Sequence, residues 1–255
     1  IAYDSGSTES YGGTTYILAA SLASTDITDT SKPNGQVNGW AGLRVPYEFV
    51  SRYFNVSGQN YVTGTYDVDD QRAKSFYIKG RQESMDGALY VFMNGWSSLK
   101  FNNIPHDMTQ DTFNNPVSSH SNIDLPIIRL GEVYLTYAEA CVRLGQGATA
   151  QPKMDELAVR TGVPALTLPT SWDNAARDMF VAERARELLW ESCRRIDLIR
   201  YDLYSGDEYL WPYKGGESAA GQSFPKYKEL FAIPASQIEA NPDLYNPDGY
   251  DQKSE

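Results

Sequence analysis

The sequence predicts a mainly α-helical protein with small β elements: a tetratricopeptide-like αα-hairpin and a long helix packed with a loop-rich region of short strands. Residues 170–200 contain neither proline nor glycine, and their apolar side chains recur at helical spacing. Two shorter helical patterns precede them, separated by Gly145-Gln146-Gly147. We therefore divide the chain into a loop-rich region that is predicted to bind the ligand (1–125), a helical scaffold (126–200) and C-terminal loops and turns (201–255).

The composition is that of a globular protein with an acidic balance. The 255 residues are 41% hydrophobic and 22% charged, with a net charge of −11. Nucleic-acid binding requires a basic surface, and so does an electrostatic hold on anionic lipids, so we expect neither partner. No apolar run reaches the ~20 residues that cross a bilayer. The chain opens at Ile1 without a signal peptide, so we expect a processed chain or an excised fragment.

Aromatic residues are abundant, with 18 Tyr, 5 Trp and 9 Phe. Tyr and Trp combine a flat apolar ring with a polar group, which suits a wet surface that stacks on a ligand, although most tyrosines are expected to serve the core and loops. The two cysteines, Cys141 and Cys193, both fall on apolar helix stripes, so we expect buried free thiols. A disulfide between them would require export and suitable geometry.

The first predicted helix follows a long polar stretch over residues 1–39. Pro46 is well placed at a helix start, and apolar residues follow at helical spacing, so we predict a short helix that ends near Asn55. Residues 61–66 are predicted to form a strand. The acidic turn 67–70 lacks the glycine that an EF-hand needs at its sharp turn, which argues against a calcium site.

Two short strands are predicted next, at 76–78 and 89–93. The second is apolar on both faces and is expected to be buried. Residues 102–121 then form a long polar loop, which holds both histidines, His106 and His120. These histidines lack metal-binding spacing and have no cysteine nearby, so no zinc site or other cofactor is expected.

The helical scaffold begins after Pro126. Apolar residues that step by four and three predict a helix over 130–144, which Gly145 ends. A shorter partner helix over 148–162 completes an αα-hairpin of tetratricopeptide length. The long helix over 170–200 packs next, and Thr170 or Ser171 is expected to cap it with Asp173 as the capping-box partner.

The long helix is expected to bury an apolar stripe and to expose its charges. The stripe comprises Met179, Ala182, Ala185, Leu189, Cys193, Ile196 and Ile199. The charged residues are interpreted as a solvated face with ion pairs, such as Glu191 with Arg195, each worth roughly a few tenths of a kcal/mol. Beyond this helix we predict loops around the apolar run 230–233, a helical turn at 234–241 and a turn at 246–249.

Paired carboxylates are the most serious enzymatic possibility in the sequence. Glu183 and Glu187 share a helix face, and a glycosidase needs two neighbouring carboxyl groups. However, arginines flank both residues, and ion pairing lowers the pKa of a carboxyl group, which is the wrong direction for a general acid. We therefore favour structural ion pairs, and we find no phosphate loop, dinucleotide fingerprint or nucleophile elbow.

Aromatic residues in loops are the stronger indication of a ligand. Two tryptophans, Trp40 and Trp96, each follow an Asn-Gly pair. Sugars present an apolar C–H face and a rim of hydroxyls, which rings and polar side chains recognise together. The predicted ligand-binding residues are Trp40, Trp96, Asn38, Arg44 and Asn94. The alternative is that an indole fills the core beneath its loop, and we prefer this alternative for Trp172, Trp190 and Trp211.

Three segments resemble the SusD/RagB family, in the family's order. Residues 127–145 (IIRLGEVYLTYAEACVRLG) resemble its R-x-x-E-x-Y-L-x-x-A-E-A helix. Residues 183–200 (ERARELLWESCRRIDLIR) resemble its E-R-x-x-E-L-x-x-E-G-x-R-x-x-D-L-x-R segment. Residues 230–250 (LFAIPASQIEANPDLYNPDGY) resemble its closing segment. Ser192 stands where the family usually has glycine, and Asp248 intrudes before Gly249.

The resemblance implies a SusD-like fold and a bacterial outer-membrane lipoprotein on the cell surface, typical of Bacteroidetes. Such a protein is not an enzyme: it binds a glycan or other nutrient and acts as a lid on a SusC-like TonB-dependent transporter. The chain would be the C-terminal half, reaching the membrane only through an N-terminal lipid anchor that lies outside it.

Three functional hypotheses follow. The first is a non-catalytic glycan-binding subunit that takes an oligosaccharide and delivers it to the transporter. The second is a protein-docking module for the transporter, with no sugar site in this half. The third is a carbohydrate hydrolase that uses Glu183 and Glu187.

Overall fold

The computed structural model describes residues 20–27, 29, 34, 35, 39–85, 91, 93–102, 104, 126–213, 219–241 and 243–250. Over these residues the protein is mainly helical, with strands that form two-stranded antiparallel sheets. The predicted fold class is thereby confirmed. No helix in the described ranges combines the length and apolar character needed to cross a bilayer.

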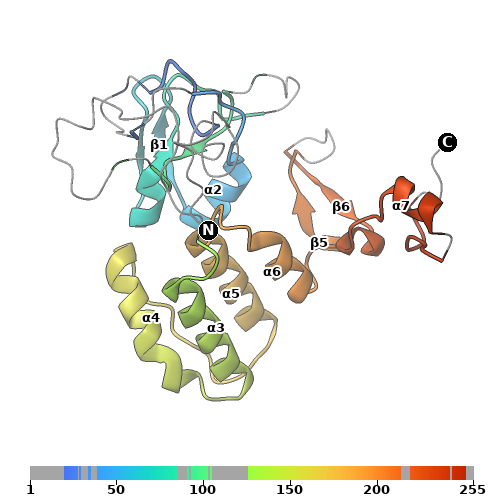
Figure 1. Cartoon of the computed structure of the whole chain (residues 1–255). Helices are drawn as coiled ribbons and strands as arrows, with labels where there is room; N and C mark the ends of the chain where they lie inside the picture. The colour runs from blue at the N-terminus through green and yellow to red at the C-terminus, as the bar shows by residue number, and fades with distance from the viewer. Residues whose placement is uncertain are drawn as a thin grey trace.

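An αα-hairpin forms one end of the molecule (Figure 1). It consists of α3 (Leu130–Arg143) and α4 (Gly147–Thr161), whose bounds agree with the predicted helices to within one residue. Gly145 and Gly162 follow the two helices at φ 72° and 71°, a left-handed conformation that glycine adopts without steric cost. Helix α5 (Asn174–Glu187) packs beside α3 and joins the hairpin to the rest of the chain.

The prediction of a single long helix over 170–200 is wrong. The chain forms α5 and then α6 (Arg194–Arg200), with residues 188–193 between them. Trp190 and Ser192 both adopt φ 62°, in the left-handed region that a right-handed helix cannot include. The break therefore lies at the position where the family motif usually has glycine, and a change of chain direction there needs a positive φ.

The start and the buried face of α5 also differ from the prediction. Asp173 is itself the N-cap, and its carboxylate accepts a hydrogen bond from the Ala176 N–H at 2.8 Å. The face that α5 buries includes charged residues, Glu183, Arg184 and Glu187, beside apolar ones. In α6, Ile196 of the predicted stripe is 66% exposed. This packing therefore differs from both the predicted apolar stripe and the predicted solvent-exposed charged face.

The loop-rich part of the chain is built on short elements at the other end of the molecule (Figure 1). They are α2 (Tyr47–Phe54), β1 (Ser57–Asn60), β2 (Thr65–Asp67), η1 (Gln71–Ser75), β3 (Phe76–Tyr77) and β4 (Ser97–Ser98). The helix predicted after Pro46 is confirmed, and Asn55 ends it at φ 49°. The strand predicted at 61–66 is misplaced, because residues 61–64 turn between β1 and β2. The strand predicted at 89–93 falls largely outside the described residues.

Two large buried clusters meet on α5. The helical cluster includes Leu135, Val142 and Phe180, and the loop-side cluster includes Phe76 and Trp96 together with Ala185 of α5. Because α5 contributes to both clusters, it fixes the position of the loop-rich part on the helical scaffold.

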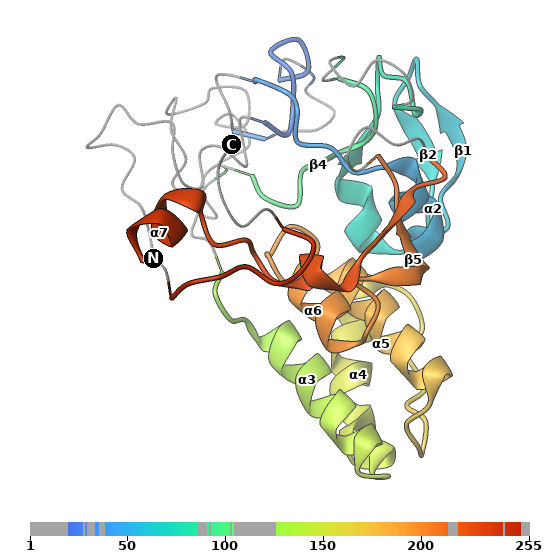
Figure 2. The same ribbon diagram turned by 90° about the vertical axis from the view of Figure 1, so that its right-hand side faces the viewer.

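The C-terminal region forms a hairpin that the sequence pattern did not reveal. Strands β5 (Gly206–Trp211) and β6 (Gln222–Phe224) pair antiparallel, and they are followed by η4 (Lys226–Glu229) and α7 (Ala235–Ala240). The helical turn predicted at 234–241 is confirmed as α7. In both views the hairpin lies beside α6 and α2, while α7 extends away from the helical scaffold (Figures 1 and 2).

Candidate functional site

The structure separates the two tryptophans on which the predicted sugar site depends. Trp40 is 40% exposed, and its backbone pairs with Ala23 through an isolated β-bridge. Its neighbour Asn38 lies outside the described residues. This partial exposure does not test the prediction that Trp40 stacks on a ligand.

Trp96 is completely buried, with 0% exposure. Its indole meets the rings of Tyr66 and Phe76 edge to face, with centroids 5.2 and 6.0 Å away, and its backbone pairs with Val45. Since protein atoms cover the indole, the prediction that Trp96 stacks on a ligand is corrected. The indole instead fills the loop-side core, which was the alternative interpretation.

Arg44 and Asn94 come together from distant parts of the sequence. A guanidinium nitrogen of Arg44, Nη1, donates to the carbonyl oxygens of Val91 at 3.0 Å and Asn94 at 3.5 Å. Burial, and to a smaller extent the nearby charge of Arg81, lowers the pKa of Arg44 from its ordinary value. Arg44 also lines a large groove, whereas Trp40, Asn94 and Trp96 do not.

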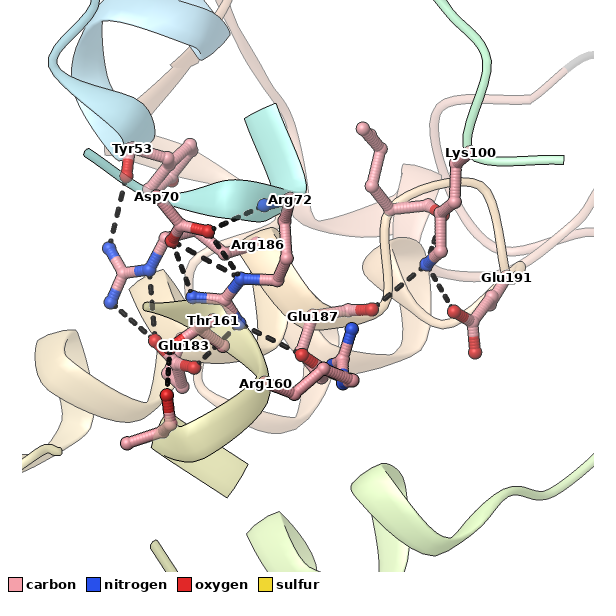
Figure 3. Close-up of polar contacts among 12 residues, drawn as sticks. Tyr53, Asp70, Arg72, Lys100, Arg160, Thr161, Glu183, Arg186, Glu187 and Glu191 are labelled. Carbon is pink, nitrogen blue, oxygen red and sulfur yellow. Dashed lines mark hydrogen bonds and ion pairs between the residues drawn. The ribbon is translucent and has the colours of Figure 1, made fainter. Parts of the chain in front are cut away.

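The predicted acidic pair belongs to a buried network that joins the two halves of the fold (Figure 3). We call this network the charge junction. Arg72 Nη1 lies 2.7 Å from Glu183 Oε1 and 2.9 Å from Glu187 Oε2. Arg129 Nη1 lies 2.6 Å from Glu187 Oε1. The other members are Asp70, Lys100, Arg160, Arg186 and Glu191.

The charge junction does not resemble an acid–base pair. The Glu187 side chain is 0% exposed; its burial would raise its pKa, but the guanidinium groups of Arg129, Arg160 and Arg72 outweigh burial and hold the pKa below its ordinary value. A general acid needs a raised pKa, so Glu187 is unsuited to that role. Glu183 is likewise paired, with Arg72 and Arg186. These contacts favour a structural role for both residues.

A groove of about 950 Å³ lies between α2, the segment 188–195 and the β5–β6 hairpin. Aromatic side chains form much of its lining: Phe49, Tyr53, Trp190, Tyr209, Trp211 and Tyr213. Five arginines and three carboxylates line it as well: Arg44, Arg52, Arg184, Arg194, Arg195, Glu48, Asp207 and Glu208. Rings beside charged and polar groups are typical of a site for a ligand with both apolar and polar faces.

The rings and cations of the groove hold one another in place. The guanidinium carbon of Arg194 lies 5.2 Å from the ring centroids of both Tyr53 and Tyr209, and that of Arg52 lies 5.6 Å from Tyr209. Trp211 stacks on Phe224 with centroids 5.5 Å apart, and its indole N–H donates to the Tyr204 carbonyl at 3.0 Å. The groove is therefore largely preformed, which lowers the entropic cost of binding.

Sequence reasoning missed most of this groove. Trp172 packs against the helical core and stacks on Phe180 with centroids 5.9 Å apart, as the core alternative predicts. Trp190 and Trp211 pack on a core only in part and also line the groove. Trp211, Pro212 and Tyr213 lie in a glycine-containing stretch, which was a usable signal for an exposed aromatic loop.

Metal and thiol chemistry find no support in the described ranges. No group of three or more His, Cys, Asp or Glu residues there could hold a metal ion. Within the acidic turn 67–70, Asp70 pairs with Arg72 at 2.7 Å. His106 and His120 lie outside the described residues. Cys141 is buried and Cys193 half-buried, and both are free thiols.

Comparisons with known proteins identify several proteins that are similar to this chain. The model of the SusD family matches residues 88–250. The starch-binding protein SusD of Bacteroides thetaiotaomicron is 27% identical over 286 residues, which cover 98% of this chain and 48% of that protein. The chain thus spans about half the length of this curated relative. A crystal structure of a SusD-like protein from Bacteroides fragilis matches 61% of this chain and 31% of that one, with 21% identity and a TM-score of 0.43.

Proposed function

The chain belongs to the SusD family, and from that premise we propose that it is a non-catalytic subunit that binds a carbohydrate. The single observation that carries the proposal is the groove, where aromatic rings and fixed arginines line about 950 Å³. The relative from Bacteroides thetaiotaomicron is named a starch-binding protein, which supports a carbohydrate as the ligand class.

The chemistry of the groove suits a sugar. Tyr209 and Trp211 supply flat rings for the apolar C–H face of a pyranose, while Arg52 and Asp207 supply a donor and an acceptor for its hydroxyls. We propose that Trp40 adds a further stacking surface, with Asn38, Arg44 and Asn94 as hydrogen-bonding residues. Arg44, which lines the groove and contacts the Asn94 carbonyl, supports the link between the two sets of residues.

Family membership also supports a proposal for the cellular role. The protein would be lipid-anchored on the outer surface of the outer membrane through a segment beyond this chain. It would deliver its ligand to a SusC-like TonB-dependent transporter, as the family's members are expected to do.

A docking role is the second candidate, and one surface favours it. Helix α3 and its C-cap, Leu144, carry an exposed apolar stripe opposite the buried face of the helix. Leu130, Val133, Tyr137 and Leu144 are 59%, 47%, 44% and 72% exposed. Their steps of three, four and seven place them on one side of the helix. A stripe of this kind suits packing against another helix, whether in the remainder of the protein or in a partner.

Calorimetric titration of the chain with a panel of neutral and acidic oligosaccharides tests the proposal. We expect at least one ligand, whose affinity falls in Tyr209→Ala and Trp40→Ala by roughly 2–10-fold each, because each variant removes one stacking ring. Tyr245→Ala is the matched control, since Tyr245 is 78% exposed and does not line the groove. A folded chain that binds no oligosaccharide would contradict the proposal and leave the docking role.

A further inference from the structure

Building on the proposed carbohydrate-binding function, we propose that the groove takes an anionic oligosaccharide, one whose sugar units carry carboxylate or sulfate groups. The proposal names the ligand class of the groove from the way the chain distributes its arginines.

Arginines outside the groove are neutralised by the protein's own carboxylates. Each of them forms a salt bridge within 4.0 Å: Arg72, Arg81, Arg129, Arg143, Arg160, Arg177, Arg186 and Arg200. In the groove, Arg184 is also paired, with Asp197 at 2.7 Å. The protein carries a net charge of −11, so carboxylates are in excess and pairing is the normal outcome.

Three groove arginines depart from this pattern. Among the described residues, Arg52, Arg194 and Arg195 have no carboxylate partner, and all three line the groove. Neutral groups position them instead. Arg194 donates to the Val181 carbonyl at 3.0 Å and to the Tyr53 hydroxyl at 2.5 Å. Among the described residues these three groove arginines therefore form no direct ion pair, although Arg195 is close enough to Glu229 to help lower the pKa of that carboxyl group.

The carboxylates of the groove offset only part of this charge, because Glu48 and Asp207 line it together with Arg52, Arg194 and Arg195. Glu208 pairs with Arg177, which is not part of the lining. Glu48 accepts a hydrogen bond from the Tyr213 hydroxyl at 3.4 Å. Arg194 Nε is buried and has no hydrogen-bond partner in the described part of the chain, so a donor remains unsatisfied beside the groove.

A sugar acid satisfies the rings and the cations together. The ring of a uronate offers an apolar face to Tyr209 or Trp211, and its planar carboxylate matches the forked N–H donors of an arginine. A sulfate ester offers the same charge with tetrahedral geometry. A neutral sugar would leave the arginines uncompensated, so charge is the property on which the groove should select.

Titration of the chain with four probes tests this selectivity. The probes are tetragalacturonate, its fully methyl-esterified form, sulfated maltotetraose and maltotetraose. We expect tetragalacturonate to bind roughly tenfold or more tighter than its methyl ester, which has the same sugar backbone without the charge. The difference in affinity should narrow as salt is added. The sulfated probe distinguishes recognition of charge alone from recognition of a planar carboxylate.

Arg52→Gln locates the effect in the groove. Arg52 is exposed, so this variant is expected to fold. Its affinity for the anionic probe should fall by roughly 3–10-fold, and any affinity for maltotetraose should fall by a smaller factor, because glutamine keeps an N–H donor for hydroxyls but loses the charge. Arg143→Gln is the control: it also removes an arginine that stacks on a ring, with its guanidinium carbon 3.6 Å from the Trp172 centroid, but outside the groove.

Equal affinity for tetragalacturonate and its ester would overturn the anionic ligand and leave carbohydrate binding intact. An unchanged anionic affinity in Arg52→Gln would overturn the groove as its location. A folded chain that binds none of the probes or of the wider panel would overturn the proposed function as well.

Discussion

The charge junction and the groove use the same residue types in opposite ways. In the junction, Arg72 and Arg129 meet buried carboxylates within hydrogen-bond distance. In the groove, Arg52 and Arg194 lie against aromatic rings and have no carboxylate partner among the described residues. The two regions share the end of α5 and the segment that follows it, so the contrast arises within one part of the chain.

This difference distinguishes charges that stabilise the fold from charges that can bind a ligand. A buried ion pair is costly to break, because the surviving charge stays desolvated. A cation held by rings and carbonyls keeps its full charge for an incoming anion. The predictions below test whether the junction is structural and the groove is not, from the largest expected effect to the smallest.

The largest effect is expected in the junction. Glu187→Gln removes a charge that contacts Arg72, Arg129 and Arg160, so we expect the free energy of unfolding to fall by about 3–5 kcal/mol. Urea denaturation followed by circular dichroism measures it. Glu156→Gln is the control, because Glu156 is exposed and its pairing with Lys153 is at the surface. Equal urea midpoints for wild type and Glu187→Gln would contradict a stabilising role of the charge junction.

Acid should weaken the junction but not the groove. In the junction, the pKa of Glu187 is lowered from an ordinary 4.5. Outside it, the pKa of Glu139 in α3 is lowered as well, because burial opposes ionisation but Arg200, Tyr201 and Arg143 outweigh it. Folding thus favours the ionised forms, whose contribution is complete above the ordinary pKa and is lost as the pH falls through the lower folded pKa. We expect the urea midpoint to be steady from about pH 7 to 5.5 and to fall below about pH 4.5.

Variants sharpen the acid experiment. Glu187→Gln should flatten the fall in the urea midpoint, since one of the titrating groups has been removed. Arg52→Gln should keep the wild-type profile, because Arg52 contacts no carboxylate within the described ranges. A flattened profile for Arg52→Gln would show that the groove cations also take part in stability.

A smaller effect is expected where the groove meets the break after α5. Ser192 adopts φ 62°, which costs a residue with a Cβ atom roughly 1 kcal/mol or more, whereas glycine adopts it freely. Ser192→Gly also makes the unfolded chain more flexible, so we expect a net gain of only about 0.5 kcal/mol. Ser192→Ala keeps the Cβ atom and serves as the comparison; an equal gain there would contradict the backbone explanation.

The smallest effect is expected for the groove arginine itself. Arg52→Gln should change the free energy of unfolding by less than about 0.5 kcal/mol, because Arg52 is exposed and forms no salt bridge with the described residues. Thermal denaturation measures this change. A fall of several kcal/mol in the free energy of unfolding would contradict the view that the groove arginines, unlike the charge junction, contribute little to stability.

Local patterns predicted elements but not what those elements bury. The hairpin of α3 and α4 follows from apolar spacing and from Gly145, since these act within one or two helical turns. The charged face of α5 could not be predicted in the same way. The partners of Glu183 and Glu187 include Arg72, 111 and 115 residues away, and nothing local in the sequence indicates such a pair.

The site shows the same division. Trp40 and Trp96 follow identical Asn-Gly pairs, yet one is 40% exposed and the other 0%. Arg44 was predicted among the ligand-binding residues and does line the groove, but Tyr209 and Trp211 join it only because the β5–β6 hairpin folds beside α2. The opposite environments of the tryptophans depend on the segments that cover them.

The sequence by itself determined the helical class, the position of the αα-hairpin and the family motifs, because helix periodicity and glycine ends act over a few residues. Only the tertiary structure decided which carboxylates are buried against arginines, which indole is covered and which arginines lack a direct carboxylate partner among the described residues. Burial and pairing depend on segments that are distant in the chain and adjacent in space, and no local pattern encodes that adjacency.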